Sequence, residues 1–160
     1  MHRCLNLGCG RNVLEGYENY DLYPVDARVI KLDISQLPLP FEDRYADEIL
    51  LSHVLEHLNI NHLDFIMECY RILKPRGRLH IALPVRDGGI EHIREVFDKD
   101  YFQCLFVSSE GKGSSQTCFN LFALIGFRKK YNSLSTFFWK IRHWVESFFY
   151  SEYEWELRKK

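Results

Sequence analysis

Two glycines near the start of the chain, and an aspartate that follows them, have the clearest chemical meaning. Leu5 to Gly10 reads Leu-Asn-Leu-Gly-Cys-Gly, an apolar strand that ends in Gly-x-Gly, and Asp21 ends the next strand-like run. A backbone that leaves a strand through glycines has no side chains at the turn, so a ligand can approach the main chain closely. A carboxylate at the tip of the neighbouring strand can accept hydrogen bonds from both ribose hydroxyls. The pattern predicts a site for an adenosine-type ligand.

Three histidines, His53, His57 and His92, are candidate general bases. Neutral imidazole is the natural base near pH 7, and a base accelerates a reaction in which a hydroxyl is the acceptor. For each of them the simpler interpretation is a structural or exposed histidine. His57 lies further along the segment that follows its strand, so its alternative role is to fix that segment.

Short strands must hold these residues at one edge of a sheet. After the first strand, the sequence predicts strands at Tyr17 to Asp21, Val29 to Asp33, Ala46 to Ser52 and Arg78 to Leu83. Strands that alternate with helical segments indicate a mostly parallel α/β sheet, whose ligands bind at the carboxyl ends of the strands. The residues at such ends are Gly10, Asp21, Asp33 and Ser52.

The most regular helix is predicted from Leu63, where apolar residues recur at helical spacing as far as Leu73. The run Lys74-Pro75-Arg76-Gly77 then supplies a basic last turn, a proline and a glycine stop. The segment 35–43 has two prolines and no helical period, so a loop is expected there.

The second half of the chain is predicted to hold helices at 98–107 and 117–125, the latter ended by Gly126, and strands at 127–132 and 152–160. Largely aromatic residues at helical spacing predict an amphipathic helix over 134–149. That helix can pack on the core, cover an apolar or sugar acceptor, or contact a lipid-linked substrate at a membrane surface. The basic clusters 128–130 and 158–160 are expected at solvated strand ends.

The composition indicates one globular domain over residues 1–160, because the chain has 160 residues, of which 46% are hydrophobic. A net charge of −1 gives no electrostatic case for nucleic acid as a partner. Five cysteines without a Cys-x-x-Cys pair argue against a disulfide framework and favour a reducing cytoplasm. No secretory signal is evident, and no stretch approaches the ~20 apolar residues of a membrane span.

Five motifs follow one another along residues 3–84. They are Leu-Asn-Leu-Gly-Cys-Gly from Leu5, Tyr-Asp-Leu around Asp21, Pro38 to Phe41 with Tyr45-Ala46-Asp47, Ser52-His53-Val54-Leu55-Glu56-His57-Leu58, and Arg71 to Leu79. In this order they resemble the class I S-adenosylmethionine-dependent methyltransferases, and within them the small branch related to ubiquinone and menaquinone methyltransferases and to methyltransferases of polysaccharide clusters. The resemblance implies an α/β fold, a Rossmann-like three-layer sandwich with a mostly parallel seven-stranded sheet, an antiparallel closing strand and a shortened first helix.

The resemblance also implies roles for single residues. The backbone of Gly8, Cys9 and Gly10 would line the methionine part of S-adenosyl-L-methionine, and Asp21, next to Leu22, would hold the ribose. Asp33 and Ile34 would flank the adenine, and Ser52 and His53 would close the other side of the site. This cofactor is a sulfonium cation without phosphate, so carboxylates and a short helix can serve it, whereas a pyrophosphate would need a full helix N-terminus.

The chain departs from the family pattern in three places. Asn6 stands where many relatives have an acidic residue, and Arg76 replaces a common glycine. Only ten residues separate Gly10 from Asp21, too few for the full first helix, so a more open cofactor site is expected.

Three other functions compete with a methyltransferase. A nicotinamide dehydrogenase is disfavoured because Val13 replaces the third glycine of Gly-x-Gly-x-x-Gly and Asp21 follows too soon. The string from His53 to His57 also spells the His-x-x-Glu-His zinc motif, but no downstream carboxylate stands out as a third ligand, so no metal is expected. A non-catalytic relative that keeps the fold as a cofactor-binding or partner module is the more serious alternative.

The sequence therefore predicts an enzyme that transfers a methyl group from S-adenosyl-L-methionine to a small-molecule or glycan-type acceptor, which can be lipid-linked. We expect residues 1–84 to bind the cofactor and residues 85–160 to bind or cover the acceptor. Contact with a membrane surface is expected, if at all, through residues 134–149.

Overall fold

The computed structural model describes residues 2–84, 122–131 and 150–160. The strands are β1 (Cys4–Leu7), β2 (Glu18–Asp21), β3 (Val29–Lys31), β4 (Ala46–Ser52), β5 (Leu73–Pro84), β6 (Phe122–Tyr131) and β7 (Tyr150–Lys159). Between β4 and β5 lie the 3-10 helix η1 (Leu55–His57) and the α-helix α1 (His62–Ile72). The predicted helices at 98–107 and 134–149, and residues 117–121 and 132, lie outside the described residues.

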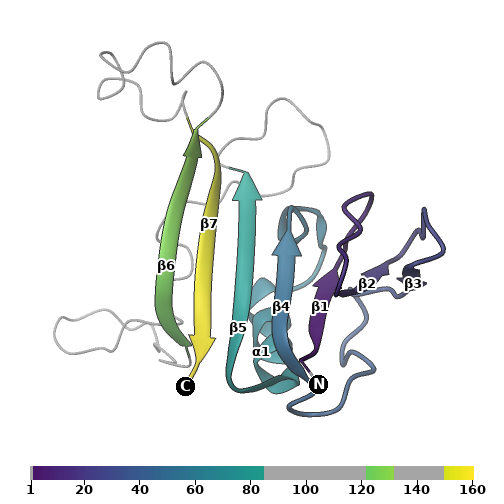
Figure 1. Ribbon diagram of the computed structural model, residues 1–160, viewed down its shortest axis with the longest axis horizontal. Coiled ribbons are helices and arrows are strands. Elements are labelled where there is room, and N and C mark those ends of the chain that lie inside the picture. Colours follow the sequence, from purple (N-terminus) through teal and green to yellow (C-terminus); the bar gives the residue numbers. More distant parts are fainter. Residues whose placement is uncertain (1, 85–121, 132–149) are drawn as a thin grey trace, which may run out of the picture.

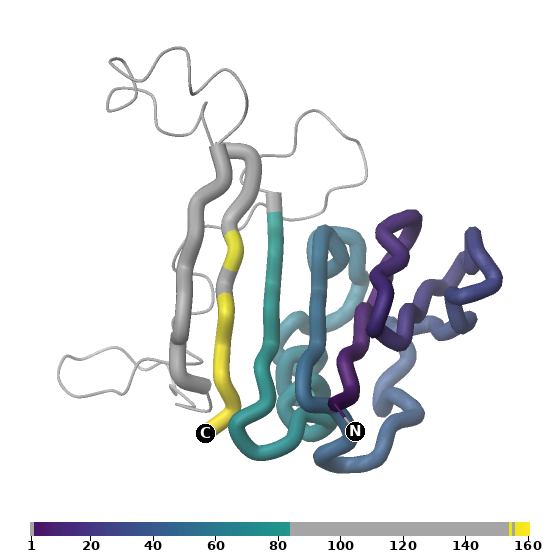
Figure 2. Tube along the Cα trace, viewed as in Figure 1, coloured from purple at the N-terminus to yellow at the C-terminus, as the bar shows by residue number. Residues whose placement is uncertain are grey.

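The strands form one sheet in the order β3-β2-β1-β4-β5-β7-β6 (Figure 1). The pairs β1 with β2, β1 with β4, β2 with β3, and β4 with β5 are parallel. β7 is antiparallel to both of its neighbours, β5 and β6. The expectation of a mixed, mostly parallel sheet with one antiparallel strand is confirmed, and the carboxyl ends of β1, β2 and β4 lie along one edge, here called the carboxyl edge (Figure 2).

The core lies between the sheet and α1, which packs behind β4 and β5 in Figure 1. α1 forms because its apolar residues recur at helical spacing and because Asn61 caps its N-terminus, accepting hydrogen bonds from the amides of Leu63 (2.9 Å) and Asp64 (3.4 Å). Fully buried side chains of the core include Leu5, Leu7, Ile49, Leu51, Phe65, Ile66 and Ile72. Of the three predicted layers, the described residues show the sheet and the layer that holds α1.

The helix ends earlier than the sequence predicted, because residues 73–77 belong to β5 rather than to a last helical turn. Pro75 cannot continue a helix and disfavours helical backbone at the residue before it. Arg76 adopts a left-handed φ of 65°. A Cβ at Gly77 would lie 2.8 Å from the carbonyl oxygen of Lys74 and 3.2 Å from that of Asp47, so this glycine permits two backbones to approach.

Lys159 corrects the expectation of a solvated basic cluster at the end of β7. Its residue is only 8% exposed, and its Nζ donates hydrogen bonds to the carbonyl oxygens of Tyr70 (2.7 Å) and Leu73 (2.8 Å). Carbonyls at a helix C-terminus lack partners within the helix, and a cation there also interacts favourably with the helix dipole. The side chain therefore ties β7 to the end of α1.

The predicted helix at 117–125 is wrong over residues 122–125, which form the start of β6. A short apolar run fits either periodicity, and here the pairing with β7 decides in favour of a strand. Gly126 is not a helix stop, because it lies inside β6 where the register with β7 shifts. The predicted closing strand is confirmed as β7, and the predicted strand at 127–131 is part of β6.

Candidate active site

Asp21 and Gly10 are brought together at the carboxyl edge, as the sequence predicted. The parallel pairing of β1 with β2 allows the amides of Gly8 and Cys9 to donate to the carbonyl oxygen of Tyr20, at 2.8 and 3.0 Å. The Gly10 amide then donates to Oδ2 of Asp21 (2.8 Å), and the Tyr23 amide donates to Oδ1 (2.9 Å). A carboxylate has about four acceptor positions, so both oxygens of Asp21 keep capacity for further donors.

The two glycines of this turn, Gly8 and Gly10, differ in what a side chain at each position would meet. A Cβ at Gly8 would lie 2.7 Å from Cγ2 of Val54 and 3.4 Å from Cδ1 of Ile34, so protein side chains fill the space beside it. A Cβ at Gly10 would meet no atom of the described residues within 4 Å. Open space for a ligand lies beside Gly10, whereas Gly8 permits close packing of the core.

The short connection between β1 and β2 is held by two buried amides. Asn6 is 1% exposed, and its Nδ2 donates to the carbonyl oxygen of Asn12 (2.8 Å) and to Oδ1 of Asn19 (2.9 Å). Asn19 also accepts from the Leu14 amide (2.9 Å) and donates to the carbonyl oxygens of Leu14 (2.9 Å) and Tyr17 (3.0 Å). The departure at Asn6 therefore has a structural reason, since its amide supplies donors that an acidic residue lacks.

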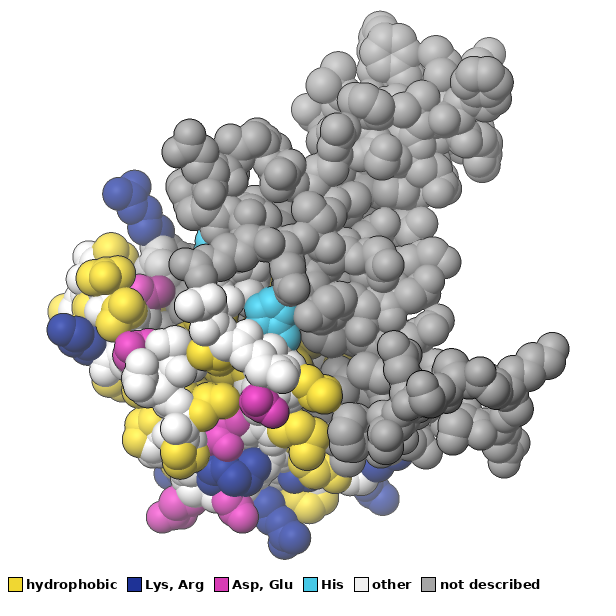
Figure 3. Space-filling model, turned by 180° about the vertical axis from the view of Figure 1, so that it is seen from behind, with side chains coloured by type: hydrophobic (Ala, Val, Ile, Leu, Met, Phe, Trp, Pro, Cys, Tyr) yellow, Lys and Arg dark blue, Asp and Glu magenta, His cyan; other side chains and the backbone are white. Residues whose placement is uncertain are grey.

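The residues predicted to flank adenine do not form one uniform surface. Asp33 is partly buried, and its Oδ1 accepts hydrogen bonds from the hydroxyl (2.6 Å) and amide (3.0 Å) of Ser35, which lower the pKa of this carboxyl. Ile34 is buried in the core beside Gly8. Leu22 is 37% exposed and belongs to a set of exposed hydrophobic residues that also includes Tyr23, Val25, Ile30 and Leu37. Figure 3 shows hydrophobic side chains at the surface of the described part of the chain.

Cys9 is suited to contribute backbone rather than a reactive thiol. Its residue is 6% exposed, and burial, followed by the nearby charge of Asp21, raises the pKa of the thiol. A thiol with a raised pKa is a poor nucleophile, because the thiolate is the reactive form.

His53 follows Ser52, the last residue of β4, and therefore lies at the carboxyl edge. Its backbone has a left-handed φ of 55°, and its amide donates to the carbonyl oxygen of Ala82 (2.9 Å). Nδ1 of its half-exposed ring lies 3.5 Å from Oε1 of Glu56, a residue only 1% exposed. The sequence did not lead us to predict a functional role for Glu56, although its position three residues after His53 could have indicated contact between the two side chains.

The structure gives less information about the other two predicted histidines, His57 and His92. His57 ends η1 and is exposed, and His92 lies outside the described residues. The His-x-x-Glu-His string lies partly on a single 3-10 turn rather than on an α-helix, so its histidines do not have the spacing of a helical zinc motif. Within the residues that the structure describes, no group of three metal-binding side chains occurs.

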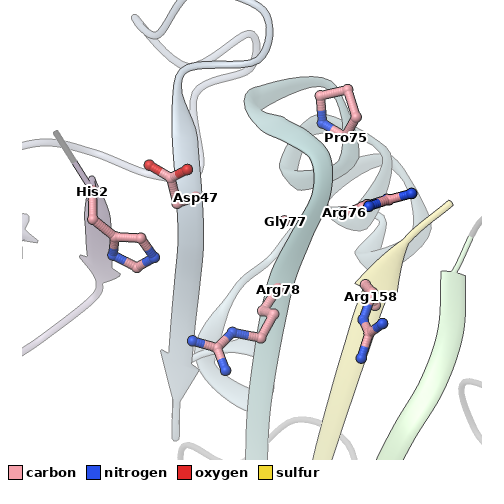
Figure 4. A pocket seen from close by; sticks show the side chains of 7 residues that line it. All are labelled: His2, Asp47, Pro75, Arg76, Gly77, Arg78 and Arg158. Atoms are coloured by element: carbon pink, nitrogen blue, oxygen red, sulfur yellow. The ribbon is translucent and has the colours of Figure 1, made fainter.

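A pocket of about 280 Å³ lies at the opposite edge of the sheet, near the beginnings of β4 and β5 (Figure 4). Arg78 and Arg158 are directly opposite each other in β5 and β7, and Arg78 is paired with Glu48 (3.0 Å) and more distantly with Glu156 (3.9 Å). None of the predicted site residues lines this pocket. We therefore place the candidate active site at the carboxyl edge.

The strand order and comparison with solved structures define the class of fold. The structure is similar to the crystal structure of a SAM dependent methyltransferase from Archaeoglobus fulgidus, with a TM-score of 0.67 and 14% sequence identity over 99% of this chain and 86% of that chain. The fold is thus the Rossmann-like fold of S-adenosylmethionine-dependent methyltransferases. No helix in the described part of the chain is long and apolar enough to span a membrane.

Sequence comparisons point to the same class. Residues 11–81 match the family model described as Methyltransferase domain. Over 64 residues the chain is 41% identical to a 25S rRNA (adenine(645)-N(1))-methyltransferase of Saccharomyces cerevisiae, which covers 40% of this chain and 15% of that protein. It is 31% identical over 112 residues to a "Probable S-adenosylmethionine-dependent methyltransferase" of Mycolicibacterium smegmatis, which covers 53% of this chain and 41% of that protein.

The chain thus spans less than half the length of these two curated relatives. The matched family model and these two relatives are named as methyltransferases, and one relative is named as dependent on S-adenosylmethionine. The residues at the carboxyl edge fit this cofactor, because an oriented carboxylate with acceptor capacity lies beside the open space at Gly10.

Proposed function

We propose that this chain transfers the methyl group of S-adenosyl-L-methionine to a small-molecule or glycan-type acceptor. The observation that supports the proposal most directly is the Asp21 carboxylate, which the amides of Gly10 and Tyr23 hold in place next to open space. Two amide donors fix the direction of both oxygens before a ribose arrives. Such a site would recognise the diol of an adenosine.

The other residues of the carboxyl edge take roles around Asp21. Backbone of Gly8, Cys9 and Gly10 lines the methionine part, Leu22 lies next to Asp21, and Ile34 and Asp33 lie toward the adenine. Of these, Leu22 offers exposed apolar surface, whereas Ile34 acts from the core by shaping the turn at Gly8. Ser52 and His53 close the side formed by β4.

When bound, the cofactor supplies an electrophilic methyl group on a positively charged sulfur. The main task of the chain is to hold the acceptor atom in line with that methyl group, because orientation alone can contribute about 7–11 kcal/mol. A hydroxyl acceptor also benefits from a general base, typically by about 100- to 10,000-fold. His53 is the favoured base because it lies at the end of β4, and His57 and His92 remain candidates.

We assign the acceptor to residues 85–160 of a single domain, with the segment 134–149 as a cover or membrane contact. The small branch of ubiquinone, menaquinone and polysaccharide-cluster methyltransferases remains the proposed relationship. A net charge of −1 argues for an acceptor other than nucleic acid, although one relative is named as an rRNA methyltransferase. The cysteines support a cytoplasmic location.

Isothermal titration with S-adenosyl-L-methionine tests the cofactor site. We expect micromolar binding by the unaltered chain and a dissociation constant at least about tenfold higher in Asp21→Ala, equivalent to about 1.4 kcal/mol. Asp26→Ala is the matched control, because Asp26 lies in the loop after β2 and hydrogen-bonds to Arg28 instead. Equal affinities in the two variants would exclude Asp21 from the site.

The alternative is a module that keeps the fold without methyl transfer. The shortened connection between β1 and β2 favours this alternative. Against it, the hydrogen bonds that Asn6 donates hold the connection in a defined conformation. A screen for S-adenosylhomocysteine release across pools of sugars, phenols and lipid-linked glycans separates the two. Cofactor binding without release in any pool would favour the module.

A further inference from the structure

Two unusual features are next to each other after β4. His53 is a non-glycine residue with a left-handed φ of 55°. Glu56 is 1% exposed, yet its Oε2 has no hydrogen-bond partner within the described part of the chain. The two residues are linked, because Nδ1 of His53 lies 3.5 Å from Oε1 of Glu56.

Both features are unfavourable for stability. A left-handed backbone is disfavoured for residues with a Cβ, and a buried polar atom without a partner loses its hydration without compensation. Such local costs are concentrated at functional sites, where the surrounding fold maintains them.

Glu68 provides a contrast within the same molecule. It is also a buried glutamate, with 9% exposure, but its Oε1 accepts from the Leu39 amide (2.7 Å) and Arg71 (2.7 Å), and its Oε2 accepts from Arg71 (2.9 Å). A buried glutamate in this fold can therefore be fully hydrogen-bonded. Glu56 is instead ion-paired, among the described residues, with a histidine at the carboxyl edge.

We propose that Glu56 is a positioning residue that holds the ring of His53 through Nδ1, so that Nε2 acts as the general base toward a hydroxyl acceptor. This inference rests on the proposed function. In the reaction, the acceptor oxygen bonds to the methyl carbon while the carbon–sulfur bond breaks and leaves its electron pair on sulfur. The hydroxyl proton moves to Nε2, and the resulting imidazolium keeps its Nδ1 proton and donates a hydrogen bond through it to the buried carboxylate.

The distance of 3.5 Å between Nδ1 and Oε1 is longer than a formed hydrogen bond. Hydrogen bonds between catalytic groups are often long before substrate binds and shorten in the complex. A carboxylate that orients a histidine also fixes which ring nitrogen carries the proton.

The tautomer of His53 is the first test, because it requires neither cofactor nor acceptor. Long-range ¹⁵N–¹H spectra of the unaltered chain, with resonances assigned through His53→Gln, distinguish a proton on Nδ1 from one on Nε2. We expect the neutral ring to carry its proton on Nδ1. A neutral ring with its proton on Nε2 would overturn the proposal.

The second test compares Glu56→Gln with Glu68→Gln. A glutamine at position 56 can donate its amide to Nδ1 and so place the ring proton on Nε2. We expect Glu56→Gln to change the tautomer and to slow carbethoxylation of His53 by diethyl pyrocarbonate about tenfold, as mass spectrometry of the peptide would show. Its melting temperature should stay the same or rise, because the variant removes a buried charge whose Oε2 has no hydrogen-bond partner among the described residues.

Glu68→Gln should show the opposite pattern, with a melting temperature lower by about 5 °C and an unchanged rate of carbethoxylation at His53. If Glu56→Gln melted lower and left the tautomer and rate unchanged, Glu56 would have only a structural role. If titration showed no cofactor binding but the Nδ1 tautomer were found, the proposed function would fail and the His53–Glu56 arrangement would stand.

Discussion

In the turn after β1, the two glycines of one motif are favoured for different physical reasons. Gly8 has a φ of 70° and lies against Val54, whereas Gly10 has a φ of 52° and lies beside open space. The motif predicted a close approach of ligand to backbone at both. The structure supports open space only at Gly10, because the side chain that occupies the space at Gly8 comes from a segment more than forty residues later in the chain.

Gly8→Ala should lower the free energy of unfolding more than an ordinary loop substitution. A Cβ there would lie 2.7 Å from Val54. Overpacking costs about 1–3 kcal/mol, and the left-handed backbone adds about 1–2 kcal/mol. Urea denaturation measures the loss, and Val54→Ala added to Gly8→Ala should recover part of it. A double variant no more stable than Gly8→Ala would contradict this explanation.

Gly10→Ala should affect the cofactor more than the fold. We expect a loss of stability of about 1–2 kcal/mol from the left-handed backbone alone. The dissociation constant for S-adenosyl-L-methionine should rise, because the new methyl group occupies the open space. Gly16→Ala is the matched control, since Gly16 has a φ of 80° and its Cβ would meet no described residue within 4 Å, whereas the amides that donate to Asp21 are those of Gly10 and Tyr23. Similar affinities for the two variants would argue against a ligand at Gly10.

The candidate site was predictable from sequence where it depends on spacing along strands. Gly10 and Asp21 end neighbouring parallel strands, and their hydrogen bond follows from that register. The burial of Glu56 was not predictable, because η1 is too short to produce a periodic pattern. The role of Asn6 was also hidden, since its partners lie in a loop without regular structure.

The prediction of a shortened first helix is wrong, because the connection between β1 and β2 is a loop that Asn6 and Asn19 hold through hydrogen bonds. Asn6→Asp should destabilise the protein by about 1–3 kcal/mol or more, because a carboxylate would face the Asn12 carbonyl and Oδ1 of Asn19 without donating to either. Asn61→Asp is the control, because aspartate caps a helix N-terminus as well as asparagine does. Chemical denaturation of both variants gives the comparison. Equal stabilities would mean that the donors of Asn6 are dispensable.

The elements themselves were predicted best where burial imposes a clear period. β4 was predicted with its observed bounds, since buried and partly buried residues define it from Ala46 to Ser52. The start of β6 was mistaken for a helix because its strand character depends on pairing with β7, a segment far along the chain. Lys159 was assigned to solvent for a similar reason, because its acceptors are carbonyls of residues 70 and 73.

Across the whole molecule, several carboxylates have lowered pKa values through named partners. Hydrogen bonds from Arg71 chiefly lower the pKa of Glu68 from its usual 4.5, and Lys74 chiefly lowers that of Asp47 from its usual 3.8. The unfolded chain therefore takes up protons at a higher pH than the folded protein does. The stabilisation is complete above these usual values and is lost as the pH falls through the lowered ones.

We expect the urea midpoint of the unaltered chain to fall steeply between about pH 5 and about pH 2. In Glu68→Gln the midpoint should already be lower near neutral pH and should fall less steeply in acid, because one of the titrating carboxylates is gone. Parallel profiles for the two proteins would show that Glu68 does not contribute to acid unfolding.

The position of β7 between β5 and β6 has a consequence for biosynthesis. During translation both neighbours of β7 leave the ribosome before it does, so each has an unpaired edge until residues 150–159 emerge. Unpaired strand edges readily join other chains, and a nascent protein in this state is exposed to misassembly. Premature termination just before β7 should therefore yield insoluble material that depends on chaperones, even though β1 to β5 have been fully synthesised.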